Sequence, residues 1–160
     1  MRLNGDIKFF YSADTLGIPD AADIRIDGFE LLRDPGFETE VLLMIGTDAR
    51  AGDDDKLPHY TSTKRGWWGD ALLGSNLGSK LWLLERSKLD DSTLTLAEQY
   101  TVDALNPLIE EEQASRIQSV ATRADVSNQA NFITRITRLD GKDVFFPYYV
   151  NWQYQIFGGI

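Results

Sequence analysis

The chain contains no cysteine and a single histidine. The absence of cysteine excludes a disulfide framework, a thiolate metal site and a cysteine nucleophile, and it is typical of a reducing cytoplasm. His59 lies beside Pro58 and Tyr60 in a polar segment, where an isolated histidine is more often solvated than bound to a metal. We therefore expect no metal site and no cofactor.

Basic residues are outnumbered by acidic ones: the chain has 16 lysines and arginines and 25 aspartates and glutamates, which give a net charge of -9. This charge repels nucleic-acid phosphates and anionic membrane surfaces, and the basic residues are scattered, so we expect neither partner. Apolar runs such as 41–45 and 81–84 are far shorter than the roughly 20 residues that span a bilayer. Residues 1–6 lack the pattern of a signal peptide, so we expect a soluble protein that is not secreted.

Catalytic motifs are missing as well: there is no G-x-S-x-G elbow, no P-loop and no G-x-G-x-x-G fingerprint. The acidic runs 53–55 and 110–112 are typical of solvated surface, and the first lacks the closing glutamate of a calcium loop. Glu38 with Glu40, or Glu85 with Asp70, could serve as the two carboxylates of a glycosidase. Any acidic protein offers such pairs, so we expect no enzyme and keep the glycosidase as an alternative.

The 160 residues, 42% of them hydrophobic, fit one α+β domain with one core. Residues 1–33 are predicted to be strand-rich, with candidate strands at 7–11, 23–26 and 29–32. Residues 34–115 are predicted to hold two or three helices and a long loop. Asp34-Pro35 starts a helix over 35–45, Thr95 and Glu98 form a capping box for a second helix, and Asn106-Pro107 starts a short helix through residue 112.

Residues 116–160 are predicted to form an antiparallel sheet, because the hydrophobic period changes to two and yields strands at 116–123, 131–139 and 144–156. Asp140-Gly141-Lys142 is a turn signal between the last two. Pro147 cannot donate to a neighbouring strand and favours an edge position for the final strand. This strand could pair with another chain. One of its faces is predicted to supply the partner interface: Val144, Phe146, Tyr148, Val150, Trp152, Tyr154 and Ile156.

Two adjacent tryptophans lie between glycines in an otherwise polar segment, in the motif Arg65, Gly66, Trp67, Trp68, Gly69 and Asp70. Each indole can bury roughly 200 Å² of surface, so a loop that carries two needs a docking place. That place is either the domain's own core or a partner. We favour the core and expect this motif to fix the loop, including a helical turn at 70–73, against the helices.

Three segments together resemble the tail-protein family named after gene 46 of bacteriophage Mu: residues 36–51, with Thr47-Asp48, residues 65–72, with the tryptophan pair, and residues 78–86, with Leu81-Trp82-Leu83-Leu84. The resemblance extends through the helix at 97–108 into the C-terminal sheet. Where the family often has two basic residues after Thr-Asp, this chain has Ala49-Arg50. The family in turn is similar to the small wedge protein of T4-type baseplates, from which the sheath begins to polymerise.

The resemblance implies a structural baseplate subunit of a contractile tail that pairs strands with the first sheath ring. It implies other baseplate subunits and sheath or tube proteins as partners, several copies in a symmetric assembly, and a place in the virion after assembly in the host cytoplasm. The alternatives are a tail-associated, lysozyme-like glycosidase acting on peptidoglycan and a soluble domain that binds a small molecule.

Overall fold

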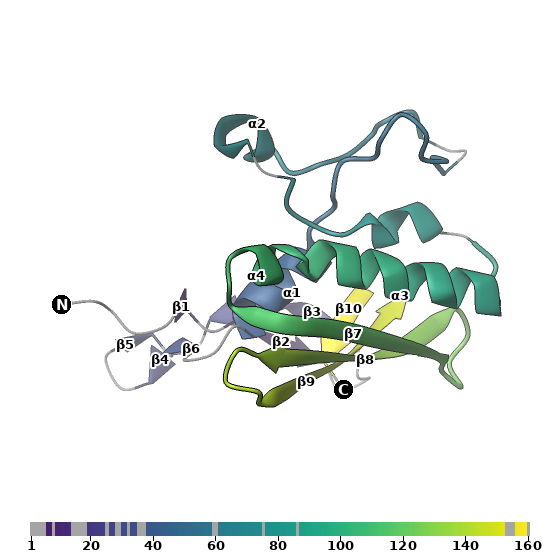
Figure 1. The fold of residues 1–160 in the computed structure, drawn as a ribbon. Helices are drawn as coiled ribbons and strands as arrows, with labels where there is room; N and C mark the ends of the chain where they lie inside the picture. Colours follow the sequence, from purple (N-terminus) through teal and green to yellow (C-terminus); the bar gives the residue numbers. More distant parts are fainter. Residues whose placement is uncertain are drawn as a thin grey trace.

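The computed structural model describes residues 6–7, 9–13, 19–24, 26–27, 30–31, 33–34, 38–58, 61–74, 76–85, 87–152 and 156–159. Helices lie on an antiparallel sheet, short N-terminal strands lie beside this body, and a long loop projects from it (Figure 1). The predicted α+β class, with helices packed on a C-terminal antiparallel sheet, is confirmed. No helix within the described ranges is both long and apolar enough to cross a bilayer.

The described residues of the N-terminal segment form short strands, which pair antiparallel in three two-stranded sheets. They are β1 (Asp6–Ile7) with β6 (Arg33–Asp34), β2 (Phe9–Ala13) with β3 (Pro19–Ile24), and β4 (Ile26–Asp27) with β5 (Glu30–Leu31). The predicted boundaries shift by a few residues, because short strands with mixed composition give weak periodicity.

Helix α1 (Glu38–Gly46) and helix α3 (Asp91–Leu105) are the two long helices. Residues 35–37, where α1 is predicted to begin, lie outside the described residues. The predicted capping box of α3 is wrong: Asp90 is the N-cap and accepts a hydrogen bond from the backbone N–H of Thr93 at 2.9 Å, so Thr95 lies inside the helix. Hydrogen bonds from the Ser92 hydroxyl and from Thr93 lower the pKa of Asp90 to about 2.

Three shorter helical segments complete the helical part: α2 (Asp70–Leu73), the 3-10 helix η1 (Lys80–Leu84) and α4 (Pro107–Glu110). The helical turn at 70–73 is confirmed. Proline occupies the start of α4, as predicted, but the side chain of Asn106 makes no capping hydrogen bond, and the helix ends before the rest of the acidic run. A proline at this position loses nothing, because the first N–H groups of a helix have no partner within it.

The sheet contains β7 (Ala114–Arg123), β8 (Gln129–Arg138), β9 (Asp143–Asn151) and β10 (Ile156–Gly159), in the order β10-β9-β8-β7. The predicted single strand over 144–156 is wrong. It ends at Asn151, and β10 returns antiparallel along β9, with Ile156 opposite Asn151 and Gly159 opposite Tyr148. Tyr154 lies outside the described residues.

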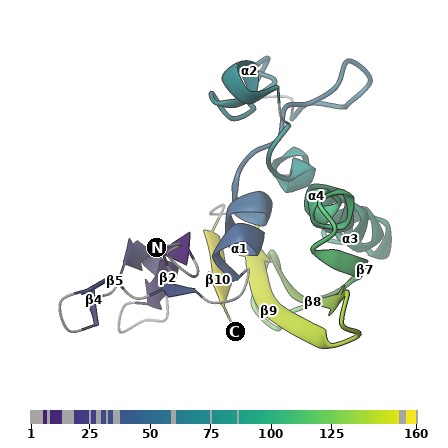
Figure 2. The ribbon, with the colours of Figure 1, turned by 60° about the vertical axis from the view of Figure 1, so that its left-hand side comes forward.

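The helices cover one face of the sheet (Figure 2). Phe132 and Tyr148 stack there with ring centroids 4.8 Å apart, and the Tyr148 hydroxyl lies 2.9 Å from that of Thr101 on α3. Burial raises the pKa of Tyr148 to about 12. The other side chains packed into this core come from the helices and from the inner face of the strands; they include Val41, Ile45, Ala97, Leu105, Leu108, Ile117, Ala130 and Ile136.

Candidate interaction site

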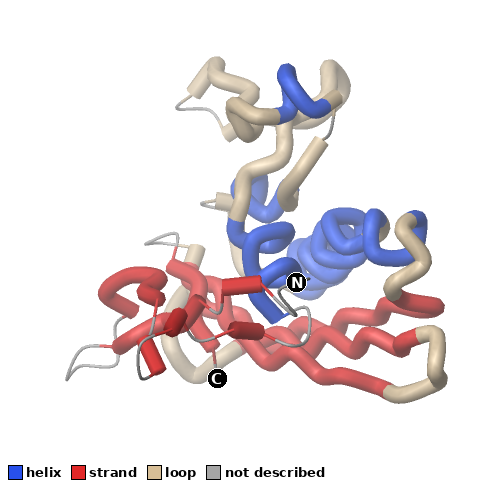
Figure 3. Tube along the Cα trace, turned by 90° about the vertical axis from the view of Figure 1, so that its left-hand side faces the viewer, coloured by secondary structure: helices blue, strands red, loops and turns tan. Residues whose placement is uncertain are grey.

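The loop between α1 and η1 stands away from the helices and the sheet, with α2 at its far end (Figure 3). Its two ends are joined at the base. The Ser79 backbone N–H donates to the Thr47 carbonyl at 2.8 Å, and the Ala49 N–H donates to the Ser79 carbonyl at 3.0 Å. The chains approach so closely that a Cβ at Gly78 would lie 2.5 Å from the Thr47 carbonyl oxygen, and Gly78 has φ +117°. Residues 47–49 and 78–79 therefore form a narrow stem. Residues 49–78, which we call the projecting loop, leave the body through this stem.

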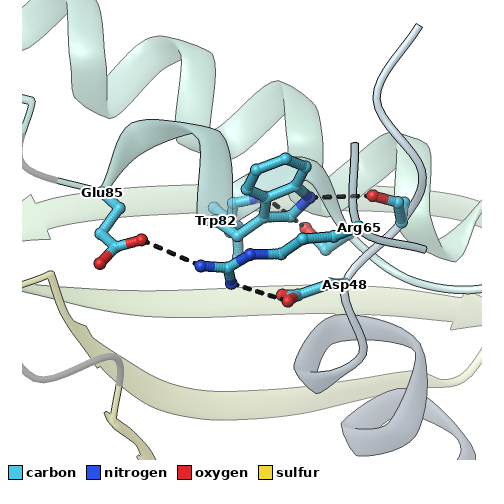
Figure 4. A network of polar contacts seen from close by, with 7 residues as sticks. Asp48, Arg65, Trp82 and Glu85 are labelled. Carbon is cyan, nitrogen blue, oxygen red and sulfur yellow. Dashed lines mark hydrogen bonds and ion pairs between the residues drawn. The ribbon is translucent and has the colours of Figure 1, made fainter. Parts of the chain in front are cut away.

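Arg65 ties the projecting loop to this stem and to the end of η1 (Figure 4). One terminal guanidinium nitrogen donates to Asp48 at 2.8 Å, and the other donates to Glu85 at 3.2 Å. The guanidinium carbon also lies 4.8 Å from the ring centroid of Trp82. The planar guanidinium can bind two carboxylates and a ring face at once, which a lysine ammonium cannot do.

Trp82 fixes the same region from the body side. Its indole N–H donates to the Ala49 carbonyl at 2.9 Å, and its side chain is buried. Sequence reasoning picked out Arg65 but missed Asp48, Trp82 and Glu85 as its partners. A signal for all three was present, since each lies within a segment that carries the family resemblance.

Asp70 closes the far end of the projecting loop. One carboxylate oxygen accepts from the Trp67 backbone N–H at 3.3 Å, and the other accepts from the Leu77 N–H at 3.0 Å. The Trp67 ring folds back over Gly69, where a Cβ would overlap it. The sequence motif is therefore a compact unit that depends on its own glycines and aspartate for its shape.

The two tryptophans of the motif have different surroundings. Trp67 is half-buried, whereas Trp68 is 77% exposed and Leu72 on α2 is 78% exposed. The expectation that both indoles dock on the helices is wrong for Trp68. Arg65 does tie the loop to the body and Asp70 holds its end together, while Trp68 leaves an apolar side chain in solvent.

The face of β9 that is predicted to meet a partner packs instead against the helices. Tyr148, Val150 and Trp152 are only 3%, 5% and 5% exposed, and Val144 and Phe146 on the same face are half-buried. Tyr148, Val150 and Trp152 therefore offer almost no surface to another chain in this conformation. The period of two placed them correctly on one face, but a pattern in one strand does not indicate whether the covering element is internal.

The opposite face of the sheet is the exposed one. Val120, Ile133 and Phe145 are 58%, 54% and 57% exposed. Val120 lies opposite Ile133, and Ile133 lies opposite Pro147. Val120, Ile133 and Pro147 therefore form a row across β7, β8 and β9. No described helix covers this face in the views shown (Figures 1 and 2).

The two edges of the sheet differ. Backbone N–H groups alternate between the two sides of an antiparallel strand. The Ala124 N–H donates to Gln129 on the β8 side, so the N–H groups of Ile117, Ser119 and Ala121 point away from β8. That of Ala121 donates to the Glu98 carboxylate of α3 at 2.8 Å, whereas no described strand pairs with this side of β7.

The side of β9 that points away from β8 is less accessible to a partner strand than the corresponding side of β7. β10 covers residues 148–151, and by the same alternation Pro147, just beyond the end of β10, turns its nitrogen away from β8 and has no N–H to offer. The edge predicted for β9 is therefore short and blocked. The edge that no described strand pairs with along its whole length belongs to β7.

Three of the four acidic residues weighed as glycosidase carboxylates bind other groups of the described chain. Glu85 binds Arg65, Asp70 binds backbone N–H groups, and Glu40 accepts from the Gln113 amide at 3.3 Å. Among the described residues no three carboxylates or histidines are grouped to hold a metal, and His59 lies outside them. A pocket of about 260 Å³ lies between α1, η1 and β9, and its two acids are the partners of Arg65.

Comparison with known proteins finds relatives among phage and prophage proteins. Residues 37–143 match the family described as Phage protein GP46. The chain is 39% identical over 107 residues to "Baseplate protein gp46" of Escherichia phage Mu, covering 67% of this chain and 72% of that protein. It is 30% identical over 106 residues to "Mu-like prophage FluMu protein gp46" of Haemophilus influenzae, covering 66% of this chain and 71% of that protein.

Proposed function

The chain belongs to the phage protein GP46 family, and from that membership we propose that it is a structural subunit of the baseplate of a phage or phage-derived contractile tail. The observation that carries the proposal is the 39% identity to a baseplate protein over 107 residues. The family match over residues 37–143 supports it, because that match spans the projecting loop, α3 and two strands of the sheet. The subunit works by assembly and not by catalysis. Its place is the tail of the virion, after assembly in the host cytoplasm.

The finer role that we propose is that of a wedge component on which the sheath begins, as in T4-type baseplates. Several copies in a symmetric assembly would contact other baseplate subunits and sheath or tube proteins. Strand pairing is the mechanism that we assign to this contact. An extended segment of a partner can add to an exposed sheet edge through main-chain hydrogen bonds.

The β7 edge supports strand pairing better than the C-terminal strand does. It is 10 residues long, and the Ile117 and Ser119 N–H groups point away from β8. Val120 and the exposed row beside it add apolar surface next to the incoming strand. Glu98 limits the addition at the Ala121 end, so we place the partner segment along residues 115–119.

The test is complementation of a tail-producing strain that lacks this gene, with sheathed particles counted by electron microscopy. Ser119→Pro removes an outward donor and blocks a partner strand, while an edge strand tolerates proline where its N–H faces outward. Thr122→Ala, on the same strand, is the control. We expect wild type and Thr122→Ala to restore sheathed tails, and a folded Ser119→Pro variant to fail.

Two results would contradict the proposal separately. Normal sheathed tails without the gene would overturn the baseplate role, and normal tails with folded Ser119→Pro protein would overturn pairing at β7. Release of peptidoglycan fragments by the purified protein, abolished by one Asp or Glu substitution, would favour the glycosidase instead.

A further inference from the structure

The projecting loop carries two exposed apolar side chains just before and within α2, Trp68 and Leu72, which are 77% and 78% exposed and which we together call the tip. We propose that this tip inserts into an apolar groove on a baseplate subunit other than this chain, as a docking element separate from the sheet edge. The inference rests on the proposed baseplate function. It adds a second contact and states the chemistry of the surface that receives it.

The tip is held in place without a partner. Asp70 binds the Trp67 and Leu77 N–H groups, Arg65 binds Asp48 and Glu85, and the stem at Gly78 fixes both ends of the loop. A loop fixed in this way loses little conformational entropy on binding. Within the described residues, the Trp68 ring makes one aromatic contact, with the half-buried Trp67 at 5.4 Å between centroids, and 77% of Trp68 is exposed, so Trp68 adds little to the stability of the chain.

The charges of the projecting loop indicate a protein groove as the receiving surface. Residues 49–78 carry four basic and four acidic side chains, namely Arg50, Lys56, Lys64 and Arg65 against Asp53, Asp54, Asp55 and Asp70. A balanced loop on a chain of net charge -9 has no electrostatic attraction for phosphates or anionic lipids. A buried indole N–H needs an acceptor, so the groove should be apolar with a carbonyl or carboxylate oxygen at its floor.

The size of the tip indicates which chain it meets. A tryptophan and a leucine bury on the order of 300 Å², well below the roughly 800 Å² per partner of a stable interface. The tip alone therefore cannot hold two copies of this chain together in solution. Buried tryptophans instead act as energetic anchors inside larger interfaces. We thus assign the tip to a contact made together with other contacts in the assembled baseplate.

The experiment replaces Trp68 with the photo-crosslinking residue p-benzoylphenylalanine in the full chain, within assembled and purified tails. Ser62, exposed in the same loop, is the control position. We expect irradiation to join residue 68, but not residue 62, to an apolar segment of a different tail protein, identified by mass spectrometry. No adduct at residue 68 above the control, or an adduct only with another copy of this chain, overturns the inference.

A second experiment compares two alanine substitutions, at Trp68 and at Trp67, by tail yield and by thermal unfolding. Trp68→Ala should reduce complete tails roughly tenfold or more while the midpoint of thermal unfolding of the purified chain stays within about 1 °C of wild type. Trp67→Ala should lower that midpoint, because its ring packs within the loop over Gly69. Wild-type tail yield with Trp68→Ala contradicts the inference. If the chain is absent from purified tails, the baseplate role itself fails, and the two failures are thus distinguishable.

Discussion

At the scale of single residues, Arg65 connects more of the molecule than any other side chain of the tryptophan motif. It binds Asp48 at the stem and Glu85 after η1, and it covers the ring of Trp82. Its backbone has φ +42°, a conformation that costs energy outside glycine. The two ion pairs and the Trp82 ring contact the Arg65 side chain from three sides and so hold the residue that precedes Gly66 and Trp67.

We predict that Arg65→Ala destabilises the chain by about 1–3 kcal/mol, because it leaves Glu85, whose side chain is 11% exposed, without its arginine. Arg65→Lys should recover part of the loss, since lysine keeps the charge but cannot bind both carboxylates. Urea unfolding followed by tryptophan fluorescence measures the effect. Equal stability of Arg65→Ala and wild type would show that the ion pairs do not hold the loop.

Tyr148 makes stability depend on pH in the alkaline range. Its pKa is about 12 in the folded chain, because burial disfavours the phenolate, whereas the ordinary pKa of a tyrosine is 10.0. The stabilisation is therefore fully present below pH 10 and is lost as the pH rises toward 12. A difference of two pKa units corresponds to roughly 2–3 kcal/mol.

We expect the wild-type free energy of unfolding to fall more steeply between pH 10 and 12 than that of Tyr148→Phe. Tyr149→Phe is the matched control, because Tyr149 lies on the outer face and its pKa is raised less. Denaturant titrations at several pH values measure the slopes. Identical slopes for wild type and Tyr148→Phe would contradict burial of the phenol.

At the scale of elements, the sequence predicted which segments form helices and strands better than it predicted which elements pair or pack with one another. The period of two identified β7, β8 and β9, and proline marked the start of α4. The reversal after Asn151 was missed because the aromatic alternation continues through Trp152 and Tyr154 and hides the turn. Which face of β9 is covered depends on α1 and α3 in three dimensions, and no pattern within one strand encodes that.

Glu98 protects part of the β7 edge, and this yields a prediction for that element. Glu98→Ala removes the acceptor of the Ala121 N–H and exposes a further donor on an edge strand. Exposed edge donors promote pairing with other chains. We expect more self-association of Glu98→Ala, seen as higher light scattering on concentration, and wild-type behaviour for Glu98→Gln, which keeps an acceptor. Monomeric Glu98→Ala at the same concentrations would contradict a pairing-competent β7 edge.

At the scale of the whole molecule, the β7 edge and the Trp68 tip belong to different parts of the fold. The edge lies in the sheet, whereas Leu72 belongs to α2, which stands away from the sheet on a loop that leaves the body through one stem (Figure 1). A subunit with two separate docking elements can bind two neighbours at once, and linked contacts raise the overall affinity. The sequence alone assigned the tryptophans to packing and the strand face to partners, whereas the structure leaves Trp68 exposed and buries Tyr148.

The most direct test of the central claim is a cryo-electron microscopy map of an assembled tail that contains this chain. We predict that the chain lies in the baseplate and that a strand from another protein extends its sheet along β7, beside residues 115–119. A map in which the chain is absent from the baseplate would contradict the proposed function. A map in which the chain is present but its β7 edge faces solvent would contradict strand pairing as its mechanism.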